Sequence, residues 1–131
     1  MTSELQSLKD KAISLAGKSP DPYMKVCCIG LDAAGTMLGY GVNHAGKVIM
    51  KDFWKDREAR RPFVIHAELD MLANCRNLPV RTIVITLLPC VNCMNALAAF
   101  GIKVVYYMDW YTKDIEAFNV AKHHGIECKR I

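Results

Sequence analysis

The chain has 131 residues, a formal net charge of +4 at pH 7 and a hydrophobic content of 52%. This length and apolar content suit one domain with a sizeable core, so we expect a single domain over residues 1–131. The charge allows an anionic ligand but is too weak to indicate a nucleic-acid-binding protein by itself.

Charged residues such as Glu4 and Lys9 stand near the start of the chain. They argue against a signal peptide or a membrane-spanning segment, so we expect a cytoplasmic protein. The chain has six cysteines, and Cys27 and Cys28 are adjacent. Without an export signal, reduced thiols are a better interpretation than disulfides.

The first elements in chain order are a helix and a hairpin. Apolar residues recur at helical spacing over residues 5–16, after a capping-box pattern at Ser3–Gln6 and before Gly17. Residues 25–31 and 36–42 then have the composition of two strands joined by a turn.

Residues 43–65 carry many charges without a clear period, and we expect a long loop with a helical turn near residues 55–60. Within it, residues 51–61 hold five basic and three acidic residues around Phe53 and Trp54. Such a segment can bind single-stranded nucleic acid. We favour a solvated loop whose aromatics pack against the core or another subunit, because the acidic residues weaken the positive field.

The rest of the chain alternates between helices and strands. We expect a helix after His66, a strand at 81–88, a helix from Pro89 to near Gly101, a strand at 103–108, a helix after Thr112 and a final strand at 126–131. This alternation indicates an α/β layer structure, with an antiparallel hairpin first and parallel strands later.

Two short motifs carry the candidate chemistry, His66-Ala-Glu68 and Pro89-Cys-Val-Asn-Cys93. The second follows an apolar β-branched run, so we expect a strand that leads into a helix with both cysteines on one face of its first turn. One histidine and two cysteines can hold zinc with a fourth position open for water, as in catalytic sites. Glu68 would lie near that water without being a ligand and could carry its proton.

Either motif alone is weak, because a lone Cys-x-x-Cys is more often a structural zinc site or a redox pair. Together and in this order they form the signature of zinc-dependent base deaminases. The chain resembles the deoxycytidylate (dCMP) deaminases of the cytidine deaminase superfamily over nearly its whole length, particularly the compact phage-type members. The matching stretches are residues 19–26, 41–43, 66–69, 86–93, 100–106, 109–111 and 124–126.

The resemblance implies a three-layer α/β/α cytidine deaminase-like fold, with a five-stranded mixed sheet flanked by helices. It implies that His66, Cys90 and Cys93 bind one catalytic zinc ion and that Glu68 is the proton shuttle. A second, structural zinc ion is not predicted. The implied reaction is hydrolytic deamination of dCMP to dUMP and ammonia by zinc-activated hydroxide, which would supply dUMP for thymidylate synthesis.

The same resemblance suggests which residues contact the base and the sugar. Asn43 resembles an asparagine that contacts the sugar hydroxyl and the base, although an asparagine that ends a strand in a turn is the alternative. Ala67 is a further candidate contact. The carbonyl group of Leu88, beside the second motif, could accept a hydrogen bond from the exocyclic amine.

For the 5′-phosphate, Tyr111 resembles the family's tyrosine after the fourth strand, and Lys113 supplies a nearby cation. Members often carry arginine directly after that tyrosine, whereas this chain has Thr112. Lys113 or Lys25 could substitute for it, and an exposed charge near a helix start is the alternative interpretation of Lys113.

The resemblance also bears on regulation and partners. Regulated dCMP deaminases carry an Asn-Gly-x-Pro-type element where this chain has Asn43-His-Ala-Gly46, so we expect no absolute need for dCTP. A homo-oligomer is expected, with a hexamer suggested by the family, in the host cytoplasm if a phage encodes the protein. Neither a membrane nor a nucleic acid is an expected partner.

Three other functions remain open. A tRNA adenosine deaminase shares the zinc motif, but residues 60–65 differ from that family's approach to the histidine. A deaminase of free cytidine or deoxycytidine stays open because the phosphate match is weaker. A non-catalytic, zinc-stabilised binding module would need a fourth protein ligand, most plausibly Cys75 or Cys128.

Overall fold

The computed structural model describes residues 2–46 and 52–131, so Lys51 of the charged segment 51–61 lies outside the described residues. Five strands form one sheet in the order β2-β1-β3-β4-β5. β1 is antiparallel to both β2 and β3, whereas β3, β4 and β5 are parallel, which confirms the mixed sheet. The strands are β1 Cys27–Leu31, β2 Met37–Val42, β3 Thr82–Leu87, β4 Val104–Asp109 and β5 Glu127–Arg130.

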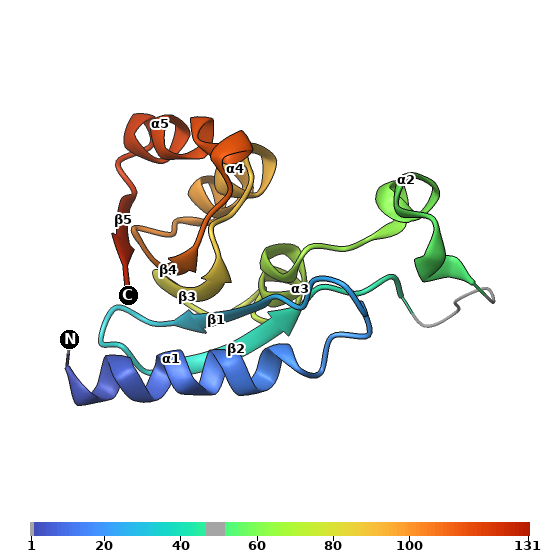
Figure 1. The fold of residues 1–131 in the computed structure, drawn as a ribbon. Helices are drawn as coiled ribbons and strands as arrows, with labels where there is room; N and C mark the ends of the chain where they lie inside the picture. The colour runs from blue at the N-terminus through green and yellow to red at the C-terminus, as the bar shows by residue number, and fades with distance from the viewer. Residues whose placement is uncertain (1, 47–51) are drawn as a thin grey trace.

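Helices cover both faces of this sheet, as Figure 1 shows. The helices are α1 Ser3–Ala16, α2 Arg57–Arg60, α3 Ala67–Asn74, α4 Val91–Phe100 and α5 Glu116–His123. α1 buries Ala12 and Ala16 against one face of the sheet. Buried residues of α3, α4 and α5, such as Met71, Met94 and Ala121, pack on the other face. The predicted three-layer fold is therefore confirmed.

The N-cap of α1 lies one residue before the predicted capping box. Thr2, not Ser3, is the N-cap, and its Oγ1 accepts a hydrogen bond from the amide of Leu5 at 3.1 Å. Both residues carry a hydroxyl that suits an N-cap, so the pattern itself did not decide between them. The helix ends at Gly17 as predicted.

The start of α4 also differs from the prediction, and the difference matters for the cysteines. Pro89 lies before the helix, Cys90 is the N-cap in an extended conformation, and Val91 is the first helical residue. Proline fits extended backbone as well as a first helical turn, so its presence did not decide the boundary. Cys93 still lies in the first turn of α4.

α3 packs very closely on β2 at Gly41. A Cβ atom at this position would lie 2.6 Å from the carbonyl oxygen of Ala67 and would also meet the amide nitrogen of Met71. The absence of a side chain lets the first turn of α3 rest directly on the strand. Gly41 thereby helps to set how closely α3, the helix that carries Glu68, packs on β2.

The long loop between β2 and α3 is closed at its base by an antiparallel bridge between His44 and Ile65. The amide of His44 donates to the carbonyl of Ile65 at 3.0 Å. The predicted helical turn is confirmed as α2, which stands away from the sheet in Figure 1. Phe53 contacts Trp54 and Phe63, with ring centroids 5.0 and 6.3 Å apart.

Two further observations concern the whole described chain. All six cysteines are free thiols. Within residues 2–46 and 52–131, none of the helices has the length and apolar character needed to cross a membrane.

Candidate metal centre and surrounding pocket

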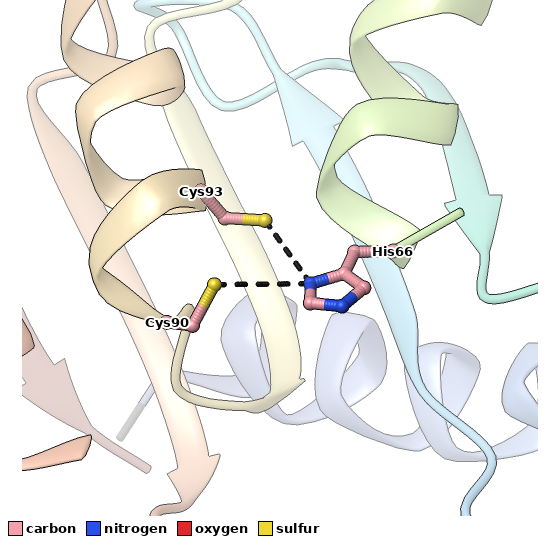
Figure 2. A group of neighbouring side chains, drawn as sticks. All are labelled: His66, Cys90 and Cys93. Carbon is pink, nitrogen blue, oxygen red and sulfur yellow. Dashed lines mark hydrogen bonds between the residues drawn. The ribbon is translucent and has the colours of Figure 1, made fainter. Parts of the chain in front are cut away.

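Two helix N-termini bring three metal-binding side chains together. His66 is the N-cap of α3, Cys90 is the N-cap of α4, and Cys93 follows one turn later. Figure 2 shows both sulfur atoms facing the imidazole ring of His66. The distances from His66 Nδ1 are 3.3 Å to Cys93 Sγ and 3.8 Å to Cys90 Sγ. All three possible ligand atoms lie within 4.8 Å of one another.

This geometry fits a tetrahedral zinc ion. With zinc bonds of about 2.0 to 2.3 Å, neighbouring ligand atoms stand roughly 3.4 to 3.8 Å apart. The observed separations from His66 Nδ1, 3.3 and 3.8 Å, correspond closely to that range. An imidazole with two thiols is also a donor set that suits zinc.

The ionisation of the cysteines supports metal binding. Hydrogen bonds with Cys93 and His66 lower the pKa of Cys90 to about 4, which favours its thiolate form. The pKa of Cys93 is raised by its hydrogen bond with Cys90 and by burial. The pKa of His66 is raised, chiefly by its hydrogen bond with Cys90. Binding a metal ion through both sulfur atoms would therefore release the proton of Cys93.

Glu68 lies in the first turn of α3, two residues after His66, and is 5% exposed. Burial raises the pKa of its carboxyl group to about 7, while its own backbone amide and the charge of His66 act in the opposite direction. A carboxyl group with a pKa near neutrality can both accept and donate a proton. Glu68 therefore has the electrostatic setting of an acid-base group.

One pocket of about 760 Å³ joins these groups. His66, Glu68 and Cys90 line it, and its volume is in the range of small-molecule sites. The structure brings all five predicted substrate contacts to its wall, namely Asn43, Ala67, Leu88, Tyr111 and Lys113. Lys25, the other candidate for the phosphate, lines a different pocket beside α1.

Asn43 is strongly held by the protein itself. Its Oδ1 accepts from the amide of Val26 at 2.8 Å, and its Nδ2 donates to the carbonyl of Met24 at 2.7 Å. The Ser19 hydroxyl donates to the Asn43 carbonyl at 2.7 Å. Asn43 thus anchors the segment between α1 and β1 to the end of β2, whatever else it contacts.

Tyr111 and Lys113 line the same pocket and follow β4. The Tyr111 hydroxyl lies 3.6 Å from the sulfur of Met24, and Lys113 Nζ is 5.4 Å from the centroid of the Tyr111 ring. Thr112–Asp114 form a short 3₁₀ helix, η3, rather than the start of α5. This turn directs Lys113 towards Tyr111.

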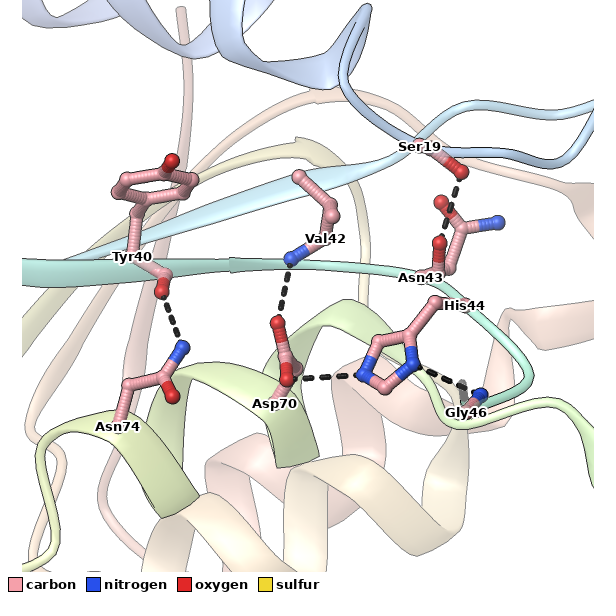
Figure 3. Close-up of polar contacts among 8 residues, drawn as sticks. All are labelled: Ser19, Tyr40, Val42, Asn43, His44, Gly46, Asp70 and Asn74. Atoms are coloured by element: carbon pink, nitrogen blue, oxygen red, sulfur yellow. Dashed lines mark hydrogen bonds and ion pairs between the residues drawn. The ribbon is translucent and has the colours of Figure 1, made fainter. Parts of the chain in front are cut away.

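The sequence analysis missed the interaction between His44 and Asp70, which Figure 3 shows. His44 Nε2 lies 2.9 Å from Asp70 Oδ1, and Asp70 Oδ2 accepts from the amide of Val42 at 3.0 Å. The amide of Gly46 donates to His44 Nδ1 at 3.0 Å. No local pattern signals this pairing, because the two residues are separated by 26 positions.

The fold and the cluster define an α/β protein with a candidate zinc site between two helix N-termini. The family model of the cytidine and deoxycytidylate deaminase zinc-binding region matches residues 2–109. The chain belongs to this family, as the sequence motifs predicted.

Three relatives illustrate the similarity. A probable deoxycytidylate deaminase of Caenorhabditis elegans is 29% identical over 112 residues, which cover 80% of this chain and 56% of the relative. The chain thus spans about half the length of this curated relative.

Two solved structures share the fold. The dCMP deaminase from cyanophage S-TIM5, solved with dCMP and dUMP, has a TM-score of 0.82 and 24% identity, covering 100% of this chain and 99% of that chain. The cytidine deaminase from Mycobacterium tuberculosis has a TM-score of 0.56 and 16% identity, covering 76% of this chain and 80% of that chain. At these identities the likeness concerns the fold.

Proposed function

We propose that this protein catalyses the hydrolytic deamination of dCMP to dUMP and ammonia, with one zinc ion held by His66, Cys90 and Cys93. The observation that carries the proposal is the pocket in which His66 and Cys90 lie beside the buried carboxyl group of Glu68. The deaminase family of the chain supports it.

Zinc bound by these three residues would lower the pKa of a water molecule towards neutrality and so supply the attacking hydroxide. Glu68 accepts the proton that this water loses and delivers it to N3 of the cytosine ring, which makes C4 electrophilic. The same carboxyl group would then take the proton of the hydroxyl group added at C4 and pass it to the amino group, which leaves as ammonia while C4 becomes the carbonyl carbon of dUMP. The net reaction consumes one water molecule for each dCMP.

Glu68 is suited to this double role by its position. At 5% exposure its carboxyl group is shielded from bulk solvent, and burial raises its pKa to about 7. A carboxyl group that ionises near the working pH can carry the proton in both directions at little cost.

The other residues of the wall position the nucleotide. We assign the carbonyl of Leu88 to the exocyclic amine, because Leu88 lines the pocket two residues before Cys90. We also assign Ala67, which lines the pocket between His66 and Glu68, to a contact with the substrate. Asn43 contacts the sugar, and Tyr111 with Lys113 lies at the phosphate end.

The choice of dCMP over other cytosine compounds rests on the relatives and on charge. The C. elegans relative is a probable deoxycytidylate deaminase, and the phage enzyme was solved with dCMP and dUMP. The cationic side chains of Arg57, Arg60, Arg61 and Lys113 line the pocket and could meet an anionic substrate, beside the carboxyl groups of Asp21, Glu58, Glu68 and Asp114. We also propose a homo-oligomer that does not depend on dCTP for activity.

The test is ammonia release by the zinc-loaded protein with dCMP, CMP, deoxycytidine, cytidine and dCTP in parallel, without an added effector. We expect turnover of dCMP with kcat/KM well above that of the other four. Turnover of deoxycytidine but not dCMP would keep the reaction and overturn the nucleotide assignment. If the zinc-loaded protein released ammonia from none of the five compounds, the proposed function would be overturned.

A further inference from the structure

Arg60, the last residue of α2, is an unusual arginine because it is only 7% exposed. Its Nη1 donates to the backbone carbonyl of Trp54 at 2.8 Å. Its guanidinium carbon lies 4.8 Å from the ring centroid of Tyr23 and 5.3 Å from that of Trp54. Two aromatic rings and one carbonyl therefore hold the guanidinium group in place.

Buried arginines are normally paired with a carboxylate. Among residues 2–46 and 52–131, no ion pair includes Arg60. A guanidinium group has five N–H donors and stays charged at all working pH values. In the same described residues every buried side-chain nitrogen has a hydrogen-bond partner, so the donors of Arg60 without a protein partner face open space.

Arg60 lines the pocket of the candidate metal centre together with His66 and Glu68. The other cationic side chains of this pocket, those of Arg57, Arg61 and Lys113, are exposed. Arg61 lies 3.6 Å from Glu58, with side-chain exposures of 75% and 80%.

The buried carboxylate nearest in sequence to Tyr23, Asp21, is occupied by the backbone. Its Oδ1 accepts from the amides of Tyr23 and Met24 at 2.8 and 3.2 Å. Arg60 thus places a fixed positive charge in the pocket wall, and its guanidinium group has N–H donors that no described protein group accepts from. Phosphate is the ligand group that such a planar fork of donors binds well.

We propose that Arg60 binds the phosphate group of the substrate and thereby makes the pocket select nucleotides over nucleosides. The inference rests on the proposed function, since it deepens the assignment of the same pocket. It gives the charged loop between β2 and α3 a role in specificity.

The kinetic test compares dCMP with deoxycytidine in zinc-loaded Arg60→Gln and Arg60→Lys variants. For Arg60→Gln, we expect kcat/KM for dCMP to fall by about 10- to 100-fold through KM, because one charge-assisted contact is lost. The kcat/KM of Arg60→Gln for deoxycytidine should stay within about two-fold of the wild-type value, because this substrate has no phosphate group for Arg60 to contact. Arg60→Lys should be intermediate, since it keeps the charge without the fork.

Lys55→Gln is the matched control. Lys55 is in the same loop and loses the same charge, but its side chain is 76% exposed and pairs with Asp52 at 3.0 Å. This variant should keep the wild-type preference for dCMP. Thermal unfolding of every variant shows whether the loop is still folded.

A binding measurement keeps the test independent of turnover. Calorimetry with dUMP and deoxyuridine should show weaker dUMP binding in Arg60→Gln and unchanged deoxyuridine binding. Equal losses for both ligands would mean that Arg60 only supports the loop, and unchanged dUMP binding would mean that it does not touch phosphate. Either result overturns the inference. If the wild-type protein binds dUMP through Arg60 but releases no ammonia, the proposed function fails and the inference about Arg60 stands.

Discussion

Asp70 on α3 lies 2.9 Å from His44 in the segment that follows β2. The pair fastens the helix that carries Glu68 to the base of the long loop, next to the bridge between His44 and Ile65. Both side chains are less than a third exposed, at 22% and 27%. The start of the loop after β2 is therefore held both by the chain before α3 and by α3 itself.

We predict a measurable energetic coupling between these two residues. In a double-mutant cycle with Asp70→Ala and His44→Ala, the coupling in the free energy of unfolding should be about 1 kcal/mol, as for one net hydrogen bond. Urea denaturation of the zinc-loaded protein measures it. Additivity of the two single changes would show that the pair contributes nothing.

Gly41→Ala should damage the protein by pushing α3 away from β2. Its new Cβ would meet backbone atoms of Ala67, Asp70 and Met71, and backbone cannot rotate aside. We expect a loss of about 3 kcal/mol or more in the free energy of unfolding, at the upper end of overpacking costs. Chemical denaturation measures this loss.

Gly39 provides the matched control on the same strand. A Cβ at Gly39 would lie 2.6 Å from the sulfur of Cys75, which is a removable side-chain atom. Gly39→Ala should therefore be rescued to within about 1 kcal/mol by adding Cys75→Ala, because the double change roughly conserves volume. A rescue of Gly41→Ala by the same change, or a Gly41→Ala protein as stable as wild type, would contradict this account of the packing.

Asn43→Ala should lower stability whether or not Asn43 contacts substrate. The change leaves the amide of Val26 and the carbonyl of Met24 without their side-chain partner. Since each unpaired buried group is costly, we expect a loss of about 2 to 4 kcal/mol. Thermal or urea unfolding measures it.

Asn119→Ala is the control for Asn43→Ala, because Asn119 is on the surface of α5 and bonds only to Glu116 at 3.3 Å among the side-chain contacts of the described residues. Its effect should stay within about 0.5 kcal/mol. An Asn43→Ala protein of wild-type stability with reduced turnover would instead assign Asn43 to the substrate alone.

Zinc content should depend on Cys90 and Cys93 but not on the other cysteines. Cys75 packs near Gly39 at the end of α3, and Cys128 lies on β5 opposite Val105. We expect one zinc ion for each wild-type, Cys75→Ala or Cys128→Ala chain, and a large loss for Cys90→Ala or Cys93→Ala. Elemental analysis after dialysis measures this. A loss of zinc on changing Cys75 or Cys128 would favour a structural site with four protein ligands.

The fold could be predicted from the sequence because the patterns that indicate helices and strands are local in the chain. Apolar periodicity located all five strands and the principal helices, and the strand before Pro89 indicated the helix of the two cysteines. The exact helix starts were less certain. Thr2 and Ser3 can both act as N-caps, and proline suits the extended position of Pro89 as well as a helical one.

The candidate metal centre was also predictable, since each half of it is a short motif at a helix start. The supporting contacts were not. Asp70 lies on α3, and its partner His44 comes from a segment 26 positions earlier in the chain. Arg60 looked like one of several charges in a solvated loop, and only the folded chain shows it buried between Tyr23 and Trp54.

The most direct test of the central claim is dUMP formation from dCMP by zinc-loaded wild-type protein and by Glu68→Gln with equal zinc content. We predict turnover by the wild type and a decrease of about 100- to 10,000-fold in Glu68→Gln, because the group that carries the proton is lost while the zinc ligands remain. Equal rates for the two proteins would contradict the role of Glu68. Absence of dUMP with the zinc-loaded wild type would contradict the account as a whole.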